Sequence, residues 1–224
     1  MDAADREVVA LVWHGRANGE RATAETFRIV ADGLAALGAE PELTAMARRA
    51  VDDELRHAEL CWRLAEYYAA RTLPAPRVVA LDLPTYDGAS DELRHTLHVT
   101  AQCCLNETTA SAFLERCLRD ATDKAARALL RELLSDEVEH ARLGWAHLAS
   151  PRLSTETRQA VASWLPRMAA TNARMWGRRP AIAITAAHAA FGVPAWETVD
   201  EVVAAAFEEL IVPGFRHVGI AITS

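Results

Sequence analysis

The chain has 224 residues, of which 51% are hydrophobic and 25% are charged, a composition typical of a soluble globular protein. The net charge of -7 argues against a nucleic-acid surface, and no run of about 18 apolar residues could span a bilayer. We therefore expect neither nucleic acid nor a membrane among its partners. The first residues, MDAADREVV, are acidic where a secretory signal needs positive charge, which predicts a cytoplasmic protein.

The first two helices of the core are predicted before residue 71. Helical periodicity dominates the whole sequence, and no segment alternates as a strand does. One helix is expected at about residues 18–37, ahead of Gly38, and a second from Pro41 to about residue 70, because proline suits a helix start. Residues 71–90 contain three prolines and a glycine and predict a long crossover.

Two further core helices are predicted after this crossover. Ser90 can cap a helix over about 91–120, and the next helix is expected at about 122–149, closed by Ser150 and Pro151. Short connections within each pair and a long one between the pairs predict an all-α four-helix bundle with a crossover between its second and third helices.

The remaining residues are predicted to add helices to the bundle. An amphipathic helix is expected at 154–177 with a kink at Pro166, and a last helix at about 195–211, ending at Pro213. Between them, residues 178–194 suit either a small-residue helix or an irregular cover.

The N-terminal residues 1–17 suit a short additional helix, and Gly15 and Gly19 argue against its continuity with the helix that follows. The length of the chain fits one large domain. We therefore expect a single domain over 1–224, with a core at 18–149 and a C-terminal helical extension at 150–224.

A duplicated phrase is the most informative feature of the sequence. Asp-Glu-x-x-His-Ala-x-Leu-x-Trp begins at Asp53 and again at Asp136. On a helix, a Glu and a His three residues apart project from the same side. Two such helices packed together bring two carboxylates and two imidazoles to one point of the core. Burying that charge without compensation is very unfavourable, so the pattern predicts a pair of metal ions.

A dinuclear carboxylate site needs one further Glu from each of the other two helices. In the third predicted helix, Glu107 lies on an otherwise apolar row, whereas Glu115 lies off that row and is read as solvated. In the first helix, Glu20 shares a face with apolar residues, although Glu25 is more nearly level with Glu54. The similarity of ERATAETF at Glu20 to ETTASAF at Glu107 favours Glu20, with Glu25 as the alternative.

The predicted metal ligands are four carboxylates and two imidazoles. They are Glu20, Glu54, His57, Glu107, Glu137 and His140. Four carboxylates and two neutral imidazoles balance two divalent ions, and these donor types suit iron or manganese. Asp53 and Asp136 each precede a ligand His by one turn, and they are predicted to accept the second ring proton of the histidines across the bundle. The pairs expected are Asp53 with His140 and Asp136 with His57.

These residues resemble those of the ferritin-like superfamily of di-iron carboxylate proteins. The phrases are most similar to those of bacterial multicomponent monooxygenases and related di-iron oxidases, and the ligand spacing is similar to that of rubrerythrin. The resemblance covers about residues 18–149. It implies activation of dioxygen or peroxide at two iron ions, with manganese–iron as a variant. It also implies that Glu54 and Glu137 bridge the ions as the catalytic carboxylates, while Glu20 and Glu107 bind at the ends.

The function expected from this resemblance is that of a di-iron oxidase or oxygenase, which uses O2 to oxidise a small organic substrate. The chain contains no C-x-x-C pair, which argues against a built-in rubredoxin-type iron site. Electrons would therefore come from an external donor or from the substrate. The alternative is an iron-handling ferroxidase, a storage protein or a peroxide scavenger. The C-terminal extension weighs against a storage cage and favours a monomer or homodimer.

Two residues near the duplicated phrases leave alternatives open. Cys61, one turn after His57, is read as a small core thiol rather than a redox group. Gly144 occupies the equivalent position in the second copy. Its missing side chain either opens a pocket for oxygen or substrate, or allows two helices to pack closely.

Overall fold

The computed structural model describes residues 1–77 and 83–221, and every regular element in these ranges is helical. Residues 78–82, which belong to the predicted crossover, and residues 222–224 lie outside the described residues. The α-helices are α1 (Ala3–Ala36), α2 (Pro41–Ala69), α3 (Asp91–Val99), α4 (Thr108–Asp120), α5 (Lys124–Ala149), α6 (Thr155–Trp176), α7 (Trp196–Ala206) and α8 (Val212–His217). The π-helices η1 (Thr100–Glu107) and η3 (Phe207–Ile211) and the 3-10 helix η2 (Ala186–Phe191) complete the set.

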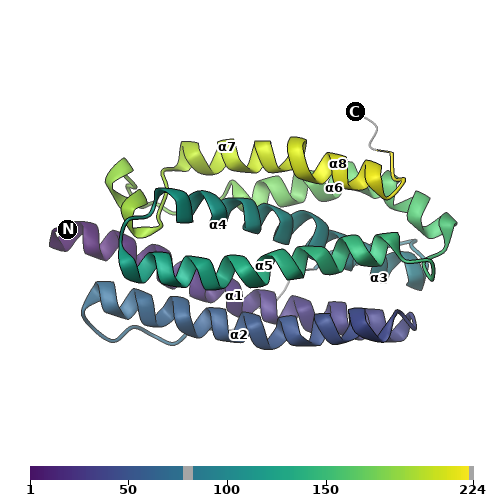
Figure 1. The fold of residues 1–224 in the computed structure, drawn as a ribbon, viewed down its shortest axis with the longest axis horizontal. Helices are drawn as coiled ribbons and strands as arrows, with labels where there is room; N and C mark the ends of the chain where they lie inside the picture. The colour runs from purple at the N-terminus through teal and green to yellow at the C-terminus, as the bar shows by residue number, and fades with distance from the viewer. Residues whose placement is uncertain (78–82, 222–224) are drawn as a thin grey trace.

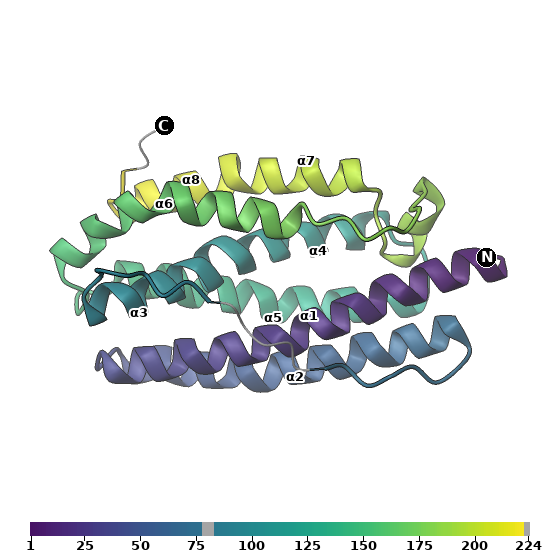
Figure 2. The same cartoon turned by 180° about the vertical axis from the view of Figure 1, so that it is seen from behind.

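Four helical rods form the body of the molecule (Figures 1 and 2). Helix α1 packs along α2, and α5 packs against both α2 and the rod formed by α3, η1 and α4. The end of α2 and the start of α3 lie at opposite ends of the body in both views, so the connection between them crosses its full length. Helices α2 and α3 therefore run in the same direction.

Side-chain caps explain where several of these helices begin. The carboxylate of Asp2, the hydroxyl of Ser90, the carboxylate of Asp123 and the hydroxyl of Ser154 each accept a hydrogen bond from a backbone N–H in the first turn that follows. These contacts satisfy donors that have no partner within the helix. Asp123 also accepts a hydrogen bond from the hydroxyl of Tyr68 at 2.7 Å, which links the start of α5 to the end of α2.

The first helix is longer than predicted. Residues 3–36 form one continuous helix, so the break expected near Gly15 and Gly19 is wrong. Both glycines are exposed, whereas Val9 and Trp13 on the opposite face are fully buried. A glycine inside a helix costs about 1 kcal/mol, and burial of an aromatic side chain outweighs that cost.

The third predicted helix contains a π-helical insertion that the periodicity does not reveal. Its middle part, Thr100–Glu107, has the wider π turn, in which each backbone N–H bonds five residues back. Hydroxyl groups support the wider turns: Thr100 donates to the carbonyl of Thr96 at 2.8 Å, and Thr109 donates to that of Leu105 at 2.7 Å. The insertion rotates the residues after it relative to a continuous α-helix.

The C-terminal helices cover the side of the body formed by α3 and α4. Helix α6 contacts α3, helix α7 contacts α4, and both views place them on the side away from α2. The last helix does not end at Pro213, as predicted, but continues to His217. Pro213 lies in the first turn of α8, where its missing N–H is tolerated.

The segment 178–194, predicted as either a small-residue helix or an irregular cover, is irregular apart from the 3-10 helix Ala186–Phe191. Its contact with α1 is fixed by Trp13, whose indole N–H donates to the carbonyl of Phe191 at 3.0 Å. Within the described ranges, no helix combines the length and apolar character needed to cross a membrane.

Candidate metal centre

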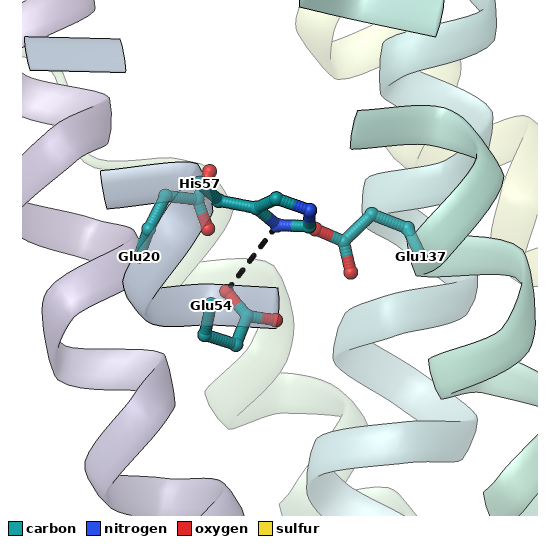
Figure 3. Close-up of side chains that lie close together, drawn as sticks. All are labelled: Glu20, Glu54, His57 and Glu137. Carbon is teal, nitrogen blue, oxygen red and sulfur yellow. Dashed lines mark ion pairs between the residues drawn. The ribbon is translucent and has the colours of Figure 1, made fainter. Parts of the chain in front are cut away.

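Six acidic and histidine side chains from four helical rods meet in the middle of the body. They form two groups that could each hold a metal ion, because the potential ligand atoms within each group lie within 4.8 Å of one another. One group is Glu20, Glu54, His57 and Glu137; the other is Glu54, Glu107, Glu137 and His140. Figure 3 shows Glu137 reaching toward Glu20, Glu54 and His57 from the opposite side.

The two groups share Glu54 and Glu137, and the distances show how they do so. Nδ1 of His57 lies 3.8 Å from Oε2 of Glu54 and 3.4 Å from Oε1 of Glu137. Nδ1 of His140 lies 3.2 Å from Oε1 of Glu54 and 3.0 Å from Oε2 of Glu137. Each glutamate thus presents one oxygen to each histidine, which is the arrangement that a carboxylate bridging two cations requires.

Buried polar atoms without partners show that the residues fit a metal. Both carboxylate oxygens of Glu54 and Nδ1 of His57 are buried and make no hydrogen bond to the described residues. Such orphaned atoms are rare in folded proteins and call for an explanation such as an ion. Carboxylate oxygens and imidazole nitrogens at one buried point are also a donor set that divalent metals bind. The cluster could therefore hold a metal ion.

Burial and mutual repulsion control the protonation of the cluster. Burial, together with the charges of Glu54 and Glu137, raises the pKa of Glu20 and of Glu107 well above the ordinary range for a carboxyl group. Burial opposes the charged imidazolium, but the nearby carboxylates of Glu137 and Glu54 outweigh it and raise the pKa of His57 to about 11. Without metal, protons therefore compensate the negative charge.

The pKa values of His140 and Glu137 are shifted in opposite directions. The pKa of His140 is raised despite burial, because Asp53, Glu137 and Glu54 surround its ring. The pKa of Glu137 is lowered despite burial, because its carboxylate is hydrogen-bonded to His140 and lies beside the ring of His57. The geometry favours a Glu137 carboxylate held between two imidazolium rings in the absence of metal.

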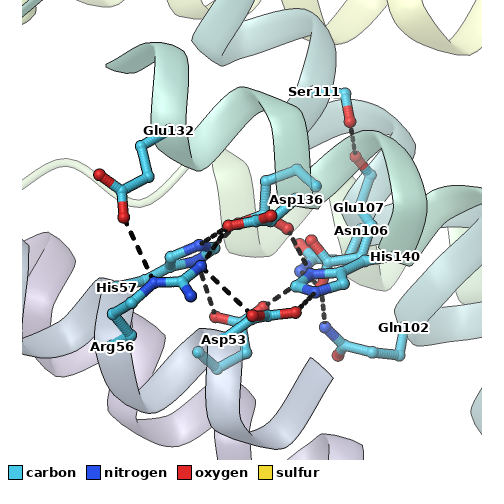
Figure 4. A network of polar contacts seen from close by, with 12 residues as sticks. Asp53, Arg56, His57, Gln102, Asn106, Glu107, Ser111, Glu132, Asp136 and His140 are labelled. Carbon is cyan, nitrogen blue, oxygen red and sulfur yellow. Dashed lines mark hydrogen bonds and ion pairs between the residues drawn. The ribbon is translucent and has the colours of Figure 1, made fainter. Parts of the chain in front are cut away.

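Each histidine also contacts an aspartate through the ring nitrogen that faces away from the cluster. Nε2 of His57 lies 3.0 Å from Oδ2 of Asp136, and Nε2 of His140 lies 3.5 Å from Oδ2 of Asp53 (Figure 4). The pairs cross the bundle, in the combination expected from the sequence. A proton held on Nε2 leaves Nδ1, which faces the carboxylates of Glu54 and Glu137, free to act as a ligand.

Arg56 is a part of this network that the sequence reasoning missed. One terminal nitrogen of its guanidinium lies 3.2 Å from Asp53 and 2.5 Å from Asp136, and Figure 4 shows the side chain in contact with both. Arg56 thus partly neutralises both aspartates. The signal in the sequence was its position three residues after Asp53, where the second copy of the phrase has Glu139 instead.

The π-helix provides Glu107 with hydrogen-bond partners that were also missed. The side-chain amide of Gln102 donates to Oε1 of Glu107, and the amide of Asn106 lies 3.4 Å from the same oxygen. Gln102 is five residues before Glu107, which corresponds to one face of a π-helix and not of an α-helix. Only a π register could have indicated this contact.

The structure separates the two candidates on the first helix. Glu20 is partly buried and belongs to the cluster. Glu25 points elsewhere and forms ion pairs with Arg21, at 2.8 Å, and with Arg28. These arginines lower the pKa of Glu25, as expected for a carboxylate in surface ion pairs. The phase of the apolar face therefore decides which glutamate points inward, and the distance from the turn does not.

Gly144 allows close packing between α5 and the π-helix. A Cβ atom at this position would lie 2.5 Å from Cβ of Cys103 and 2.7 Å from Sγ of Cys104. The missing side chain therefore does not open a pocket. Cys61 is fully buried in an apolar cluster, and burial raises the pKa of its thiol well above the usual value, which agrees with a structural role.

A cavity of about 190 Å³ lies beside the cluster, between α1, the π-helix, α6 and the end of the crossover. Its lining includes Gln102 and Asn106, the two residues whose amides face Glu107. The cavity therefore reaches the polar contacts of one potential metal ligand.

No protein-family model matches the chain, and no curated protein sequence is significantly similar to it.

Proposed function

We propose that the cluster holds two metal ions bridged by Glu54 and Glu137, in a bundle of the ferritin-like type. The observation that carries this proposal is the pairing of each shared glutamate with both histidines, one oxygen to each. Glu20 and Glu107 would each bind one ion at the ends of the cluster. A single ion would leave one histidine and one glutamate of this symmetric set without a partner.

We infer that the ions are iron, or manganese with iron. The donors are oxygen and imidazole nitrogen, which suit these metals, and no thiolate belongs to either group. Four carboxylates and two neutral imidazoles balance two divalent cations without residual charge. Asp53 and Asp136 would orient the imidazoles and increase their donor strength.

We propose that the protein is an O2-dependent oxidoreductase acting on a small organic molecule. Bound iron would supply the capacity to reduce O2, which no side chain of the protein has. The chain itself excludes bulk water from the cluster, holds its ligands in place through Asp53, Asp136 and Gln102, and offers a cavity next to Glu107. Electrons would come from an external donor or from the substrate.

Metal analysis after anaerobic loading with ferrous iron tests the proposal. We expect about two ions per chain and oxygen consumption when the loaded protein is mixed with O2. Glu137→Ala should lose both ions, because a bridging carboxylate serves both. The control Glu139→Ala removes a surface carboxylate on the same helix, whose one ion pair among the described residues is with Arg142, and this variant should keep both ions. A stoichiometry below one, or binding of zinc alone, would contradict the proposal.

Iron storage and peroxide scavenging are the competing functions. The cavity favours an organic substrate, because neither iron storage nor the reduction of peroxide needs a mainly apolar compartment of this size. Size-exclusion chromatography discriminates further: a monomer or dimer supports the enzyme, and a large cage supports storage.

A further inference from the structure

The cavity beside the cluster runs from the surface to the π-helix. At its mouth, Pro84, Thr171 and Met175 are exposed, whereas Leu105 and Met168 deeper in the lining are buried. Such a depth gradient is typical of a binding pocket and differs from both a sealed packing defect and a shallow surface groove. A ligand could therefore enter from solvent and bury most of its surface.

Most of the surface of the lining is apolar, and its polar groups are hydroxyls, side-chain amides, one histidine and one arginine. The apolar walls come from Leu83, Leu105 and Met168, among others, while Arg167 contributes the only formal positive charge among the described lining residues. Among the described residues of the lining, none is acidic. A mainly apolar compartment with one cationic side chain fits a mainly apolar molecule that has an anionic end.

Tyr86 provides a second, independent indication of a polar ligand group. Its side chain is buried, and its hydroxyl makes no hydrogen bond within the described residues. A buried hydroxyl without a partner is unfavourable, so a ligand atom that reaches it and accepts its proton would be stabilised. Burial raises the pKa of Tyr86 to about 12, with Arg167 acting in the opposite direction, so this hydroxyl is a donor at neutral pH.

The inner end of the cavity is coupled to the metal centre through hydrogen bonds. Gln102 lines the cavity, and its side-chain amide donates to Glu107. Asn106 also lines the cavity, and its amide nitrogen contacts Glu107 while its carbonyl oxygen accepts a hydrogen bond from Trp176 at 3.2 Å. These two residues thus line the cavity and contact a potential ligand of the second metal group. A molecule in the cavity would therefore be held next to the cluster.

We propose that this cavity is the substrate site and that the substrate is a small, mainly apolar carboxylate. Its hydrocarbon part would lie against Leu105 and Met168, and its carboxylate would pair with Arg167 and accept a hydrogen bond from Tyr86. This inference rests on the proposed function in one respect only: the bound molecule is a substrate only if the metal centre is redox-active. The binding of an apolar carboxylate in the cavity does not depend on the metal.

Calorimetric titration with octanoate and octan-1-ol, of both the metal-free and the iron-loaded protein, tests the inference. Octanoate should bind about tenfold more tightly than the alcohol, because only the carboxylate can form a charged hydrogen bond with Arg167. Arg167→Gln should remove this difference. The control Arg174→Gln lies on the same helix, is exposed and does not line the cavity, so it should keep the difference.

Thr171→Trp blocks the mouth at an exposed position where the fold should tolerate it, and it should abolish octanoate binding while the helical circular dichroism stays unchanged. No binding of octanoate, equal binding of acid and alcohol, or binding that survives Thr171→Trp would overturn the inference. Failure of the metal proposal is distinguishable: octanoate would still bind the metal-free protein, and elemental analysis would show no iron. Iron at two per chain without octanoate binding would overturn the substrate site alone.

Discussion

Nε2 of His57 lies 3.0 Å from Oδ2 of Asp136, although the two residues are 79 positions apart and belong to different helices. The contact fixes which ring nitrogen faces the cluster, because the proton on Nε2 is shared with the aspartate. The other nitrogen, Nδ1, then faces Glu54 and Glu137. The duplicated phrase thus supplies in each copy a glutamate and a histidine of the cluster, and an aspartate that contacts the other copy's histidine.

Asp136→Ala should weaken metal binding by about 10- to 100-fold while the protein stays helical, because His57 loses the acceptor that orients its ring. Asp136→Asn should be milder, since the amide oxygen can still accept the proton. Metal titration combined with circular dichroism measures both effects. Asp52→Ala, an exposed neighbour of Asp53, serves as the control and should bind metal normally. Equal affinity of Asp136→Ala and the wild type would remove this role from Asp136.

The two glutamates on α1 should behave differently when replaced. Glu20→Ala removes a member of the first metal group and should impair metal binding. Glu25→Ala removes only partly exposed ion pairs with Arg21 and Arg28, so the free energy of unfolding should change by less than about 1 kcal/mol. Elemental analysis and urea denaturation of both variants provide the measurements. Loss of iron from Glu25→Ala but not from Glu20→Ala would reverse the assignment.

Gly144→Ala should destabilise the protein by about 1–3 kcal/mol, because the added methyl group collides with Cys103 and Cys104. Urea denaturation at equilibrium gives the change in the free energy of unfolding. Gly15→Ala is the matched control: it is an exposed helical glycine with no atom within 4 Å of the added Cβ. It should stabilise the protein by about 0.4–1 kcal/mol. An unchanged free energy of unfolding in the Gly144→Ala variant would show that α5 and the π-helix can move apart easily.

The proximity of the six acidic and histidine residues could be predicted because it follows from short-range geometry. A Glu and a His three apart share one helix face whatever the rest of the chain does, and a phrase that occurs twice marks two such faces. The choice of Glu20 over Glu25 followed from the phase of the apolar row. The role of these residues as metal ligands stays a prediction.

The features that could not be predicted depend on tertiary packing. The π-helix at Thr100–Glu107 has no local signal in the sequence, since the residues before and after it show the same helical periodicity. The contact of Gln102 with Glu107 depends on this π-helix and could not be predicted either. The continuity of α1 through Gly15 depends on the burial of Trp13, which outweighs a local preference. The cavity brings Tyr86 from the crossover and Arg167 from α6 together, and only the fold relates these segments.

The stability of the metal-free protein should fall as the pH drops from about 6.5 to about 4, in part because of His147. This side chain is buried, and burial lowers its pKa to about 4, against the opposing charges of Glu40 and Glu92. In the unfolded chain the pKa is about 6.5, so between these values the unfolded state binds more protons and is favoured. His147 should account for up to about 3 kcal/mol of the loss in the free energy of unfolding.

His147→Gln isolates this effect, because glutamine does not titrate and can keep a hydrogen bond with Thr96, which lies 3.2 Å from Nε2 of His147. Urea denaturation at pH 7 and pH 4 should show a smaller loss of stability for the variant than for the wild type. Identical pH dependence of the two proteins would mean that His147 does not stay neutral in the folded state.

Metal binding at neutral pH should release protons and should strengthen as the pH rises. In the metal-free cluster the pKa values of Glu20 and Glu107 are raised well above normal, that of His57 is raised to about 11, and that of His140 is raised as well. Metal ligands must be deprotonated, so two ions should displace roughly two to four protons. Titration calorimetry in buffers of different ionisation enthalpy counts them.

The number of protons released should depend on the residues of the cluster and on no others. Glu20→Gln removes one of the protonated carboxyl groups, so any metal that this variant still binds should release about one proton fewer. Glu25→Ala should release as many protons as the wild type, because the carboxylate it removes is already ionised in pairs with two arginines. Binding without proton release, with an affinity unchanged between about pH 6 and pH 8, would mean that the metal-free cluster is already ionised and that protons do not compensate its charge.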